Sequence, residues 1–330
     1  MSEPLQSLPL PLGARAPAKV NLCLRLGPVL PDGRHRIVTL LESLSLADEL
    51  TLTALPPPGG FVARGRSNGD EVVCEGVAGE NLAAAALRCF RRASGWDGPP
   101  VHLRIDKRVP VAGGMGGGSG DAAAALRLVV AASGLGAQQG SWLLELAAEL
   151  GSDVPSQLAP GLVLGLGAGE RVQPLPALPA HAVLVLPAGV GLSTAAVYAE
   201  ADRLGLGRTS AELEAVEREL AAAVGEGGAA GTDGAGQLPL DLFGNDLEPA
   251  ARSLHPPIGD ALQAARDQGA ALALVSGSGP TVAGVFPGEH GAARARAAAA
   301  ALAARYPGAT AAVPVGADFG AVRAVELEDT

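Results

Sequence analysis

The chain alternates between apolar segments of strand period and longer segments of helical period. Residues 16–26 and 38–54 alternate in the manner of β-strands, with a polar, turn-rich segment at 31–36 between them. Residues 80–94 have the apolar spacing of a helix, and residues 101–106 alternate again. This order predicts mixed α and β structure in the first half of the chain.

The rest of the chain continues the mixed pattern. A glycine-dense segment leads into helices predicted at 121–132 and 138–150, and short strands rich in Val and Leu follow Pro160. The low-complexity segment 224–237 predicts a mobile loop. The other predicted elements are strands at 182–186, 271–275 and 281–286, and helices near 193–204, 209–223, 257–268 and 290–305.

Length and composition indicate a protein with two packed domains and argue against several classes of binding protein. The chain has 330 residues, of which 48% are hydrophobic and 18% charged, enough apolar material for two packed domains. We place their division near residue 165, which gives domains 1–165 and 166–330. The net charge of −10 argues against a nucleic-acid-binding protein and against attraction to an anionic membrane. Three widely spaced cysteines, with no signal-peptide pattern, predict a cytoplasmic protein.

Lysine is scarce in this chain. Lys19 and Lys107 are the only lysines among the 24 basic residues, and all the others are arginines. A bias toward arginine would leave lysine where a compact ammonium is needed and a planar guanidinium does not serve. Both lysines are therefore candidates for functional positions, the alternative being that two lysines survived by chance.

The segment 107–121 has the composition of a phosphate-binding loop. Six glycines lie between a predicted strand and a predicted helix, and glycine lets backbone N–H groups approach an anion closely. The segment is not a Walker loop, because no Gly-Lys-Ser/Thr follows, and it lacks the strict Gly-x-Gly-x-x-Gly spacing. We therefore expect a di- or triphosphate site here, with a flexible linker as the alternative. A second glycine turn at 276–281 is a weak signal by itself.

Together, three segments resemble the motifs of the GHMP kinases. The first is Pro-Ala-Lys-Val-Asn-Leu at 17–22, with Asp-Gly-Arg-His downstream at 32–35. The second is the glycine segment 110–123, and the third is the turn at 276–281. Residues 150–155, Leu-Gly-Ser-Asp-Val-Pro, and residues 245–248, Asn-Asp-Leu-Glu, match as well. The resemblance extends over nearly the whole chain.

The resemblance implies a fold and a reaction. The fold is α+β, with an N-terminal domain like ribosomal protein S5 domain 2 and a ferredoxin-like C-terminal domain. ATP and Mg²⁺ are the implied cofactors, and we expect a small-molecule substrate and a monomer or weak homodimer. The expanded Gly-Gly-Gly-Ser loop implies phosphorylation of the 2-hydroxyl of 4-diphosphocytidyl-2-C-methyl-D-erythritol, in the non-mevalonate route to isoprenoids. The alternatives are a homoserine, mevalonate or sugar kinase, or a nucleotide-binding homologue without catalysis.

The matched motifs also imply the site residues. Asp153 corresponds to the base that takes the proton of the acceptor hydroxyl, the alternative being a helix cap. Lys19 corresponds to the cation beside that base, the alternative being an exposed lysine at a strand end. The implied substrate-binding residues are Asn21, Arg34, His35 and Tyr198. The implied ATP-binding residues are Asn81, Pro110, Val111, Ala112, Gly113, Gly114, Met115, Gly116, Gly117, Gly118, Ser119 and Gly120.

Two positions depart from the family pattern. Arg34 stands where the family usually has a tyrosine that helps to hold the cytosine, so the nucleobase pocket is altered. Gly120 replaces the second serine of the loop, which removes one hydroxyl that could meet phosphate or Mg²⁺, so either Ser119 serves alone as a candidate metal ligand or a water substitutes. For His35 the alternative is an exposed loop histidine, and for Tyr198 it is core packing.

Overall fold

The computed structural model describes residues 9–55, 69–76, 81–135, 140–224 and 237–326. The predicted loop at 224–237 therefore lies outside the described residues, except for its two end residues.

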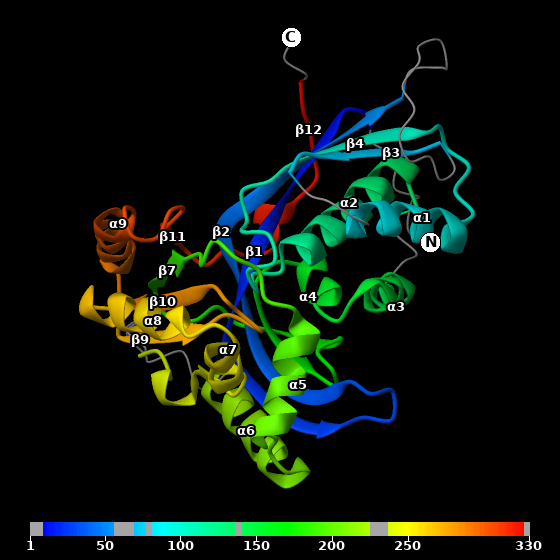
Figure 1. Cartoon of the computed structure of the whole chain (residues 1–330). Helices are drawn as coiled ribbons and strands as arrows, with labels where there is room; N and C mark the ends of the chain where they lie inside the picture. Colours follow the sequence, from blue (N-terminus) through cyan, green and yellow to red (C-terminus); the bar gives the residue numbers. More distant parts are fainter. Residues whose placement is uncertain (1–8, 56–68, 77–80, 136–139, 225–236, 327–330) are drawn as a thin grey trace.

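Two long antiparallel strands extend through the molecule and connect its two halves (Figure 1). They are β1, Leu12–Val29, and β2, His35–Ala54, and both exceed their predicted lengths. Most of their residues are buried, polar as well as apolar. The hairpin can therefore carry polar side chains into the interior between the two halves.

An eight-stranded sheet is built on this hairpin. Its central order is β12-β1-β2-β4-β3, while β5 pairs with β2 and β6, and β8 pairs with β1. The pairs β3–β4 and β1–β8 are parallel and the other pairs are antiparallel. The additional strands are β3 (Glu71–Cys74), β4 (Val101–Asp106), β5 (Leu162–Leu166), β6 (Arg171–Leu175), β8 (Gly244–Asn245) and β12 (Arg323–Ala324).

Four helices pack against one face of this sheet (Figure 1). They are α1 (Leu82–Ser94), α2 (Gly117–Ser133), α3 (Gly140–Leu150) and α4 (Val154–Leu158). Helix α2 begins at Gly117, earlier than the predicted start at Asp121, so the end of the glycine segment forms the first helical turn. The low helix propensity of glycine concealed this start.

The second half contains a four-stranded antiparallel sheet of order β11-β7-β10-β9. Helices precede β9 and separate β10 from β11, which gives the ferredoxin-like βαββαβ order and confirms that expectation. The elements are β7 (His181–Leu186), α5 (Thr194–Leu204), α6 (Ser210–Val224), η2 (Leu240–Leu242), α7 (Glu248–Leu254), α8 (Pro257–Asp267), β9 (Leu272–Val275), β10 (Val282–Pro287), α9 (Gly291–Leu302), β11 (Thr310–Ala312) and η3 (Ala317–Gly320).

The expected division near residue 165 falls inside a strand. Residue 165 belongs to β5, and the β5–β6 hairpin pairs with β2 in the first sheet. We therefore propose that the first domain extends to the end of β6, at Leu175.

One apolar cluster joins the two sheets. It combines Val20 and Leu40 of the long hairpin with Val183 and Val285 of the second sheet, all fully buried. Burial of side chains of this size typically stabilises a fold by about 1.5–3 kcal/mol each. The two halves therefore share a packed core, which fixes the residues that lie between them.

Candidate active site

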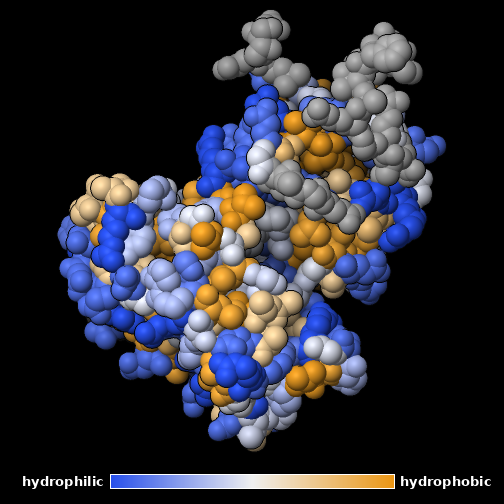
Figure 2. All heavy atoms as spheres, viewed as in Figure 1, coloured by the Kyte–Doolittle hydropathy of each residue, from blue (hydrophilic) through white to orange (hydrophobic). Residues whose placement is uncertain are grey.

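A cleft of about 480 Å³ contains most of the predicted site residues. It is lined by the glycine segment 110–119, by Lys19 and Asn21 of β1, and by Asp153 and Tyr198. Figure 2 shows an indentation on the right side of the molecule between its upper and lower parts. The cleft thus brings together four segments that are far apart in the sequence.

The two glycine turns pack against each other beside this cleft. Gly114 and Gly116 have left-handed backbones, with φ of +77° and +68°, which glycine adopts without strain. The Ser276 hydroxyl donates to the Gly114 carbonyl at 3.1 Å, and the Thr281 amide donates to the Gly113 carbonyl at 3.3 Å. The second turn, a weak signal in the sequence, therefore supports the first turn directly.

Lys19 is buried between these turns. Its ammonium donates to Asn21 Oδ1 at 2.6 Å and to the Gly114 carbonyl at 2.9 Å, and it lies 3.4 Å from Asp153 Oδ2. The residue is only 4% exposed and lies within β1, so the alternative of an exposed strand-end lysine is wrong. An ammonium has three donors, of which two are used in these hydrogen bonds, and its charge pairs with the Asp153 carboxylate.

Asp153 lies at the N-cap position of α4, yet its side chain makes no capping hydrogen bond. Its carboxylate instead pairs with Lys19 and is 34% exposed. The helix-cap alternative is therefore wrong for this side chain. A partly exposed carboxylate held beside a buried ammonium can accept a proton from a bound hydroxyl.

The predicted substrate-binding residues differ in where they lie. Asn21 and Tyr198 line the cleft, and burial raises the pKa of the Tyr198 hydroxyl, with the Asp153 charge adding to the effect. His35 is not an exposed loop histidine, because it is 8% exposed and its ring lies 5.2 Å from that of Tyr198. Arg34 lies outside the cleft lining, at the hairpin turn, where it pairs with Asp32.

Comparison with protein families decides the identity of the fold. Residues 81–161 match the model of the GHMP kinases N terminal domain, and residues 213–307 match that of the GHMP kinases C terminal domain. The chain belongs to the GHMP kinases. Like other members, this GHMP kinase is an ATP-dependent small-molecule kinase, and the glycine segment lies within the matched N-terminal region.

Relatives of this GHMP kinase share one name. The protein from Thermobifida fusca named 4-diphosphocytidyl-2-C-methyl-D-erythritol kinase is 43% identical over 285 residues, covering 83% of this chain and 87% of the relative. The protein of the same name from Streptomyces coelicolor is 44% identical, covering 82% and 85%.

Solved structures agree on the fold of this GHMP kinase. A crystal structure of 4-(cytidine 5'-diphospho)-2C-methyl-D-erythritol kinase matches with a TM-score of 0.67 and 31% identity, covering 92% of this chain and 99% of that one. A homoserine kinase from Cytophaga hutchinsonii also has a TM-score of 0.67, but at 18% identity it shows the fold alone, with coverage of 96% and 99%.

Several residues of this GHMP kinase site had no role assigned from sequence. Thr39 accepts a hydrogen bond from Asn21 Nδ2 at 2.8 Å, which turns Asn21 Oδ1 toward Lys19. Asn245 Nδ2 donates to the carbonyls of Val275 and Gly277, both at 2.7 Å, and holds the second glycine turn. The resemblance at 245–248 was the only signal for Asn245, because these contacts depend on pairing between distant segments.

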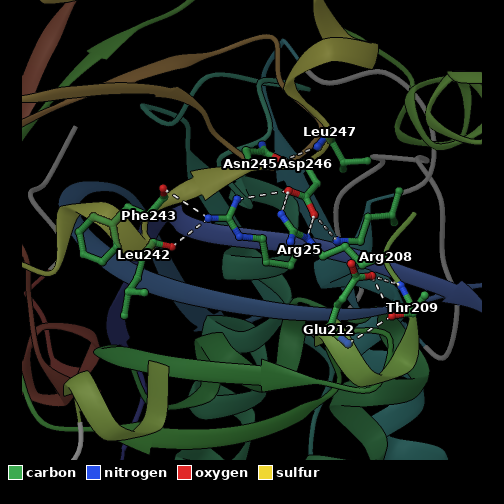
Figure 3. A network of polar contacts seen from close by, with 10 residues as sticks. Arg25, Arg208, Thr209, Glu212, Leu242, Phe243, Asn245, Asp246 and Leu247 are labelled. Carbon is green, nitrogen blue, oxygen red and sulfur yellow. Dashed lines mark hydrogen bonds and ion pairs between the residues drawn. The ribbon is translucent and has the colours of Figure 1, made fainter. Parts of the chain in front are cut away.

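A charged network holds the segment that contains Asn245 (Figure 3). The Asp246 carboxylate accepts from Arg25 at 3.2 Å and from Arg208 at 2.6 and 3.0 Å. The Leu26 amide also donates to it, at 3.1 Å. This segment is therefore fixed to β1, the strand that carries Lys19.

A cluster of three charged residues lies at the wall of the same cleft. Lys107 and Asp121 line it, and the Lys107 ammonium donates to Asp48 at 2.5 Å and to Asp121 at 2.8 Å. Burial raises the pKa of the Asp121 carboxyl to about 7, with the Lys107 charge opposing and the Asp48 charge adding. Burial alone would lower the pKa of Lys107, but the carboxylates outweigh it and raise that pKa.

We expect Gly114→Ala to destabilise this GHMP kinase more than Gly33→Ala does. Both glycines are left-handed, with φ of +77° and +84°, so alanine costs about 1–2 kcal/mol at either position. A Cβ on Gly114 would also overlap the Ser276 carbonyl, whereas one on Gly33 meets nothing within 4 Å. The free energy of unfolding in urea should therefore fall by about 2–5 kcal/mol for Gly114→Ala. Equal losses in the two variants would mean that the glycine turns do not pack tightly.

No helix of the described residues has the length and apolar character required to cross a membrane.

Proposed function

We propose that this GHMP kinase transfers the γ-phosphoryl group of ATP to the 2-hydroxyl of 4-diphosphocytidyl-2-C-methyl-D-erythritol. Relatives that share 43% and 44% of its residues carry the name of that kinase. The observation that supports phosphoryl transfer to a hydroxyl is the Lys19–Asp153 ion pair, at 3.4 Å, which lies inside the cleft. The reaction belongs to the non-mevalonate route to isoprenoid precursors.

Asp153 is the proposed general base. Its carboxylate accepts the proton of the acceptor hydroxyl while the oxygen attacks the γ-phosphorus, and the bond from that phosphorus to the β,γ-bridging oxygen breaks to release ADP. Lys19 holds the carboxylate in place and contributes positive charge where the transferred phosphoryl group becomes more negative. Because the Gly114 carbonyl accepts from Lys19, the ammonium also fixes the glycine segment relative to the base.

ATP is proposed to bind along the glycine segment. Residues 110–119 line the cleft, and the first turn of α2 presents unpaired backbone N–H groups at its N-terminus. Asn81 also lines the cleft, while its side-chain oxygen Oδ1 accepts from the Ala83 amide and caps α1. Gly120 is buried just behind the lining residues, so its proposed role is to allow close packing against β1.

Mg²⁺ fits this site as an ion held mainly by the nucleotide. The described residues contain no group of three or more His, Cys, Asp or Glu side chains suited to a metal. Ser119, in the first turn of α2, lines the cleft and offers the hydroxyl that would join the phosphate oxygens as a ligand. Bound there, the ion would neutralise phosphate charge.

The cytidine end of the substrate is proposed to stack on Tyr198. Base stacking on an aromatic ring is worth about 1–3 kcal/mol, so Tyr198→Ala should raise the KM for the cytidylyl substrate about 5- to 150-fold. The KM for ATP should change little, and Tyr198→Phe should restore most of the loss because it keeps the ring. Steady-state kinetics with each substrate varied in turn measure this. An increase confined to the KM for ATP would show that the two ligands are assigned to the wrong sides of the cleft.

His35 and Arg34 are proposed to complete that end of the site. His35 Nε2 is hydrogen-bonded to Asp202 at 2.8 Å, which orients the ring beside Tyr198. Arg34 is about half exposed and paired with Asp32 and Glu170, so contact with the substrate would require it to leave those partners. A cytoplasmic location and a monomeric or weakly dimeric state remain predictions.

The experiment that tests the proposed function is ADP release with purified protein, ATP and Mg²⁺. The acceptors are 4-diphosphocytidyl-2-C-methyl-D-erythritol, homoserine, mevalonate and galactose, each in a separate reaction. We expect a kcat/KM for the cytidylyl alcohol at least 100-fold above that for any other acceptor. The other acceptors lack both the cytosine base and the diphosphate, and the loss of either group weakens binding. Preference for another alcohol would overturn the assignment.

A further inference from the structure

Both lysines of this arginine-rich chain line the same cleft. Lys19 already has a place beside Asp153. Lys107 comes directly after β4, at the entrance to the glycine segment, and no role follows for it from the proposed reaction. We propose that Lys107 binds the phosphates of the nucleotide and that Asp48 and Asp121 hold its ammonium in position.

The two carboxylates orient Lys107 firmly. Its side chain is 13% exposed, and the carboxylates beside it are 0% and 4% exposed. Asp48 also accepts from the backbone amides of Arg108 and Val109, at 2.5 and 2.8 Å, so one carboxylate fixes both the ammonium and the chain that enters the glycine segment. A buried, doubly held lysine has little rotamer freedom left to lose when a ligand binds.

One donor of Lys107 is available to a ligand. An ammonium has three N–H donors, and Asp48 and Asp121 account for two of them among the described residues. A Cβ built on Gly117 would stand 3.2 Å from Lys107 Nζ, so the ammonium lies against the first residue of α2. The ammonium and the helix N-terminus therefore attract an anion to the same place.

The cluster is not a completed internal salt bridge. Asp121 Oδ1 is buried and has no hydrogen-bond partner among the residues described, although such a buried oxygen is normally satisfied. Two carboxylates share a single ammonium, so the cluster has a net negative charge when all three groups are ionised and is neutral when Asp121 is protonated. Because burial raises the pKa of Asp121 to about 7, its free Oδ1 can carry a proton and donate it to a phosphate oxygen beside the Lys107 ammonium.

Two phosphate sources could meet this ammonium, the ATP and the diphosphate of the proposed acceptor. The geometry favours ATP, because the Lys107 ammonium lies against Gly117 in the first turn of α2, whereas Asp153 precedes α4 and Tyr198 lies on α5. The inference rests on the proposed placement of ATP along the glycine segment, and it does not depend on which alcohol is phosphorylated.

Calorimetric binding without turnover tests the proposal. We measure adenosine, ADP, CDP and Mg²⁺ with the non-hydrolysable analogue AMP-PNP against the wild type and Lys107→Gln. Loss of a charge-assisted contact should weaken ADP and AMP-PNP about 10- to 100-fold and leave adenosine unchanged. Equal weakening of adenosine would show a merely structural role, and unchanged ADP binding would overturn the proposal. Selective weakening of CDP would assign Lys107 to the acceptor instead.

Further variants separate charge from folding. In Asp121→Asn an oxygen can still accept from Lys107 while a negative charge is removed, so ADP binding should be kept or become a few-fold tighter. A tenfold loss would contradict the proposal. If Lys107→Gln does not fold, the double variant Lys107→Gln/Asp121→Asn relieves the unpaired charge and should show the same selective loss of ADP binding. Arg104→Gln, an exposed change on β4, is the matched control and should bind all probes like the wild type.

Discussion

Asp153→Asn is expected to lower kcat by about 10²–10⁴-fold, the usual effect of removing a general base. Asparagine has nearly the same shape but cannot accept the proton of the acceptor hydroxyl. The Asp153 carboxylate is accessible to the acceptor hydroxyl, because it makes no capping hydrogen bond to α4 and is 34% exposed. Binding should be affected much less, with the KM for each substrate within a few-fold of the wild type.

Rapid-quench kinetics measure the chemical step directly for this variant. Asp260→Asn is a suitable control, since Asp260 is 73% exposed in its side chain and lies on α8. The control should keep wild-type kcat. Near-wild-type kcat for Asp153→Asn would remove the general-base assignment, whereas a rise in KM alone would make Asp153 a binding residue.

Lys19→Arg is expected to lower kcat about tenfold or more, although the charge is kept. Lys19 Nζ already makes three contacts, at 2.6, 2.9 and 3.4 Å. The surroundings are tight, because a Cβ on Gly116 would stand 2.8 Å from Lys19 Cγ, and one on Gly277 would stand 3.1 Å from Nζ. A planar guanidinium cannot enter this space without displacing the glycine turns.

The reverse exchange provides the control for this prediction. Arg15 lies on the same strand, and its side chain is 37% exposed, with a loose ion pair to Glu49 at 3.9 Å. Arg15→Lys should therefore leave kcat unchanged. Retention of wild-type kcat by Lys19→Arg would mean that the ammonium has no specific role in the chemistry.

The sequence was most informative where function depends on local motifs. Glycine density pointed to the turn that lines the cleft and is proposed to bind the phosphates of ATP, and the scarcity of lysine pointed to both Lys19 and Lys107 before their positions were known. The ferredoxin-like order of the second half also followed from the resemblance. The glycine turn depends on residues that are close in the chain, whereas the sheet order pairs distant strands and was reached only through the resemblance.

Contacts between distant segments could not be predicted. Asp48 and Asp121 meet at Lys107 only because β2, β4 and α2 pack together, and no local pattern marks either aspartate. Arg34 was predicted in the nucleobase pocket, but it also pairs at 3.5 Å with Glu170, a residue from a distant segment. The start of α2 was missed because glycine is a poor helix former, although the helix begins at Gly117, directly after the left-handed Gly116.

The identity of the phosphorylated product tests the central claim most directly. Purified enzyme is incubated with ATP, Mg²⁺ and 4-diphosphocytidyl-2-C-methyl-D-erythritol, and the product is examined by ³¹P and ¹³C NMR. We predict one new phosphomonoester signal, coupled to carbon 2 of the methylerythritol, in an amount equal to the ADP formed. Release of inorganic phosphate without that signal, or phosphorylation at another hydroxyl, would contradict the proposed reaction.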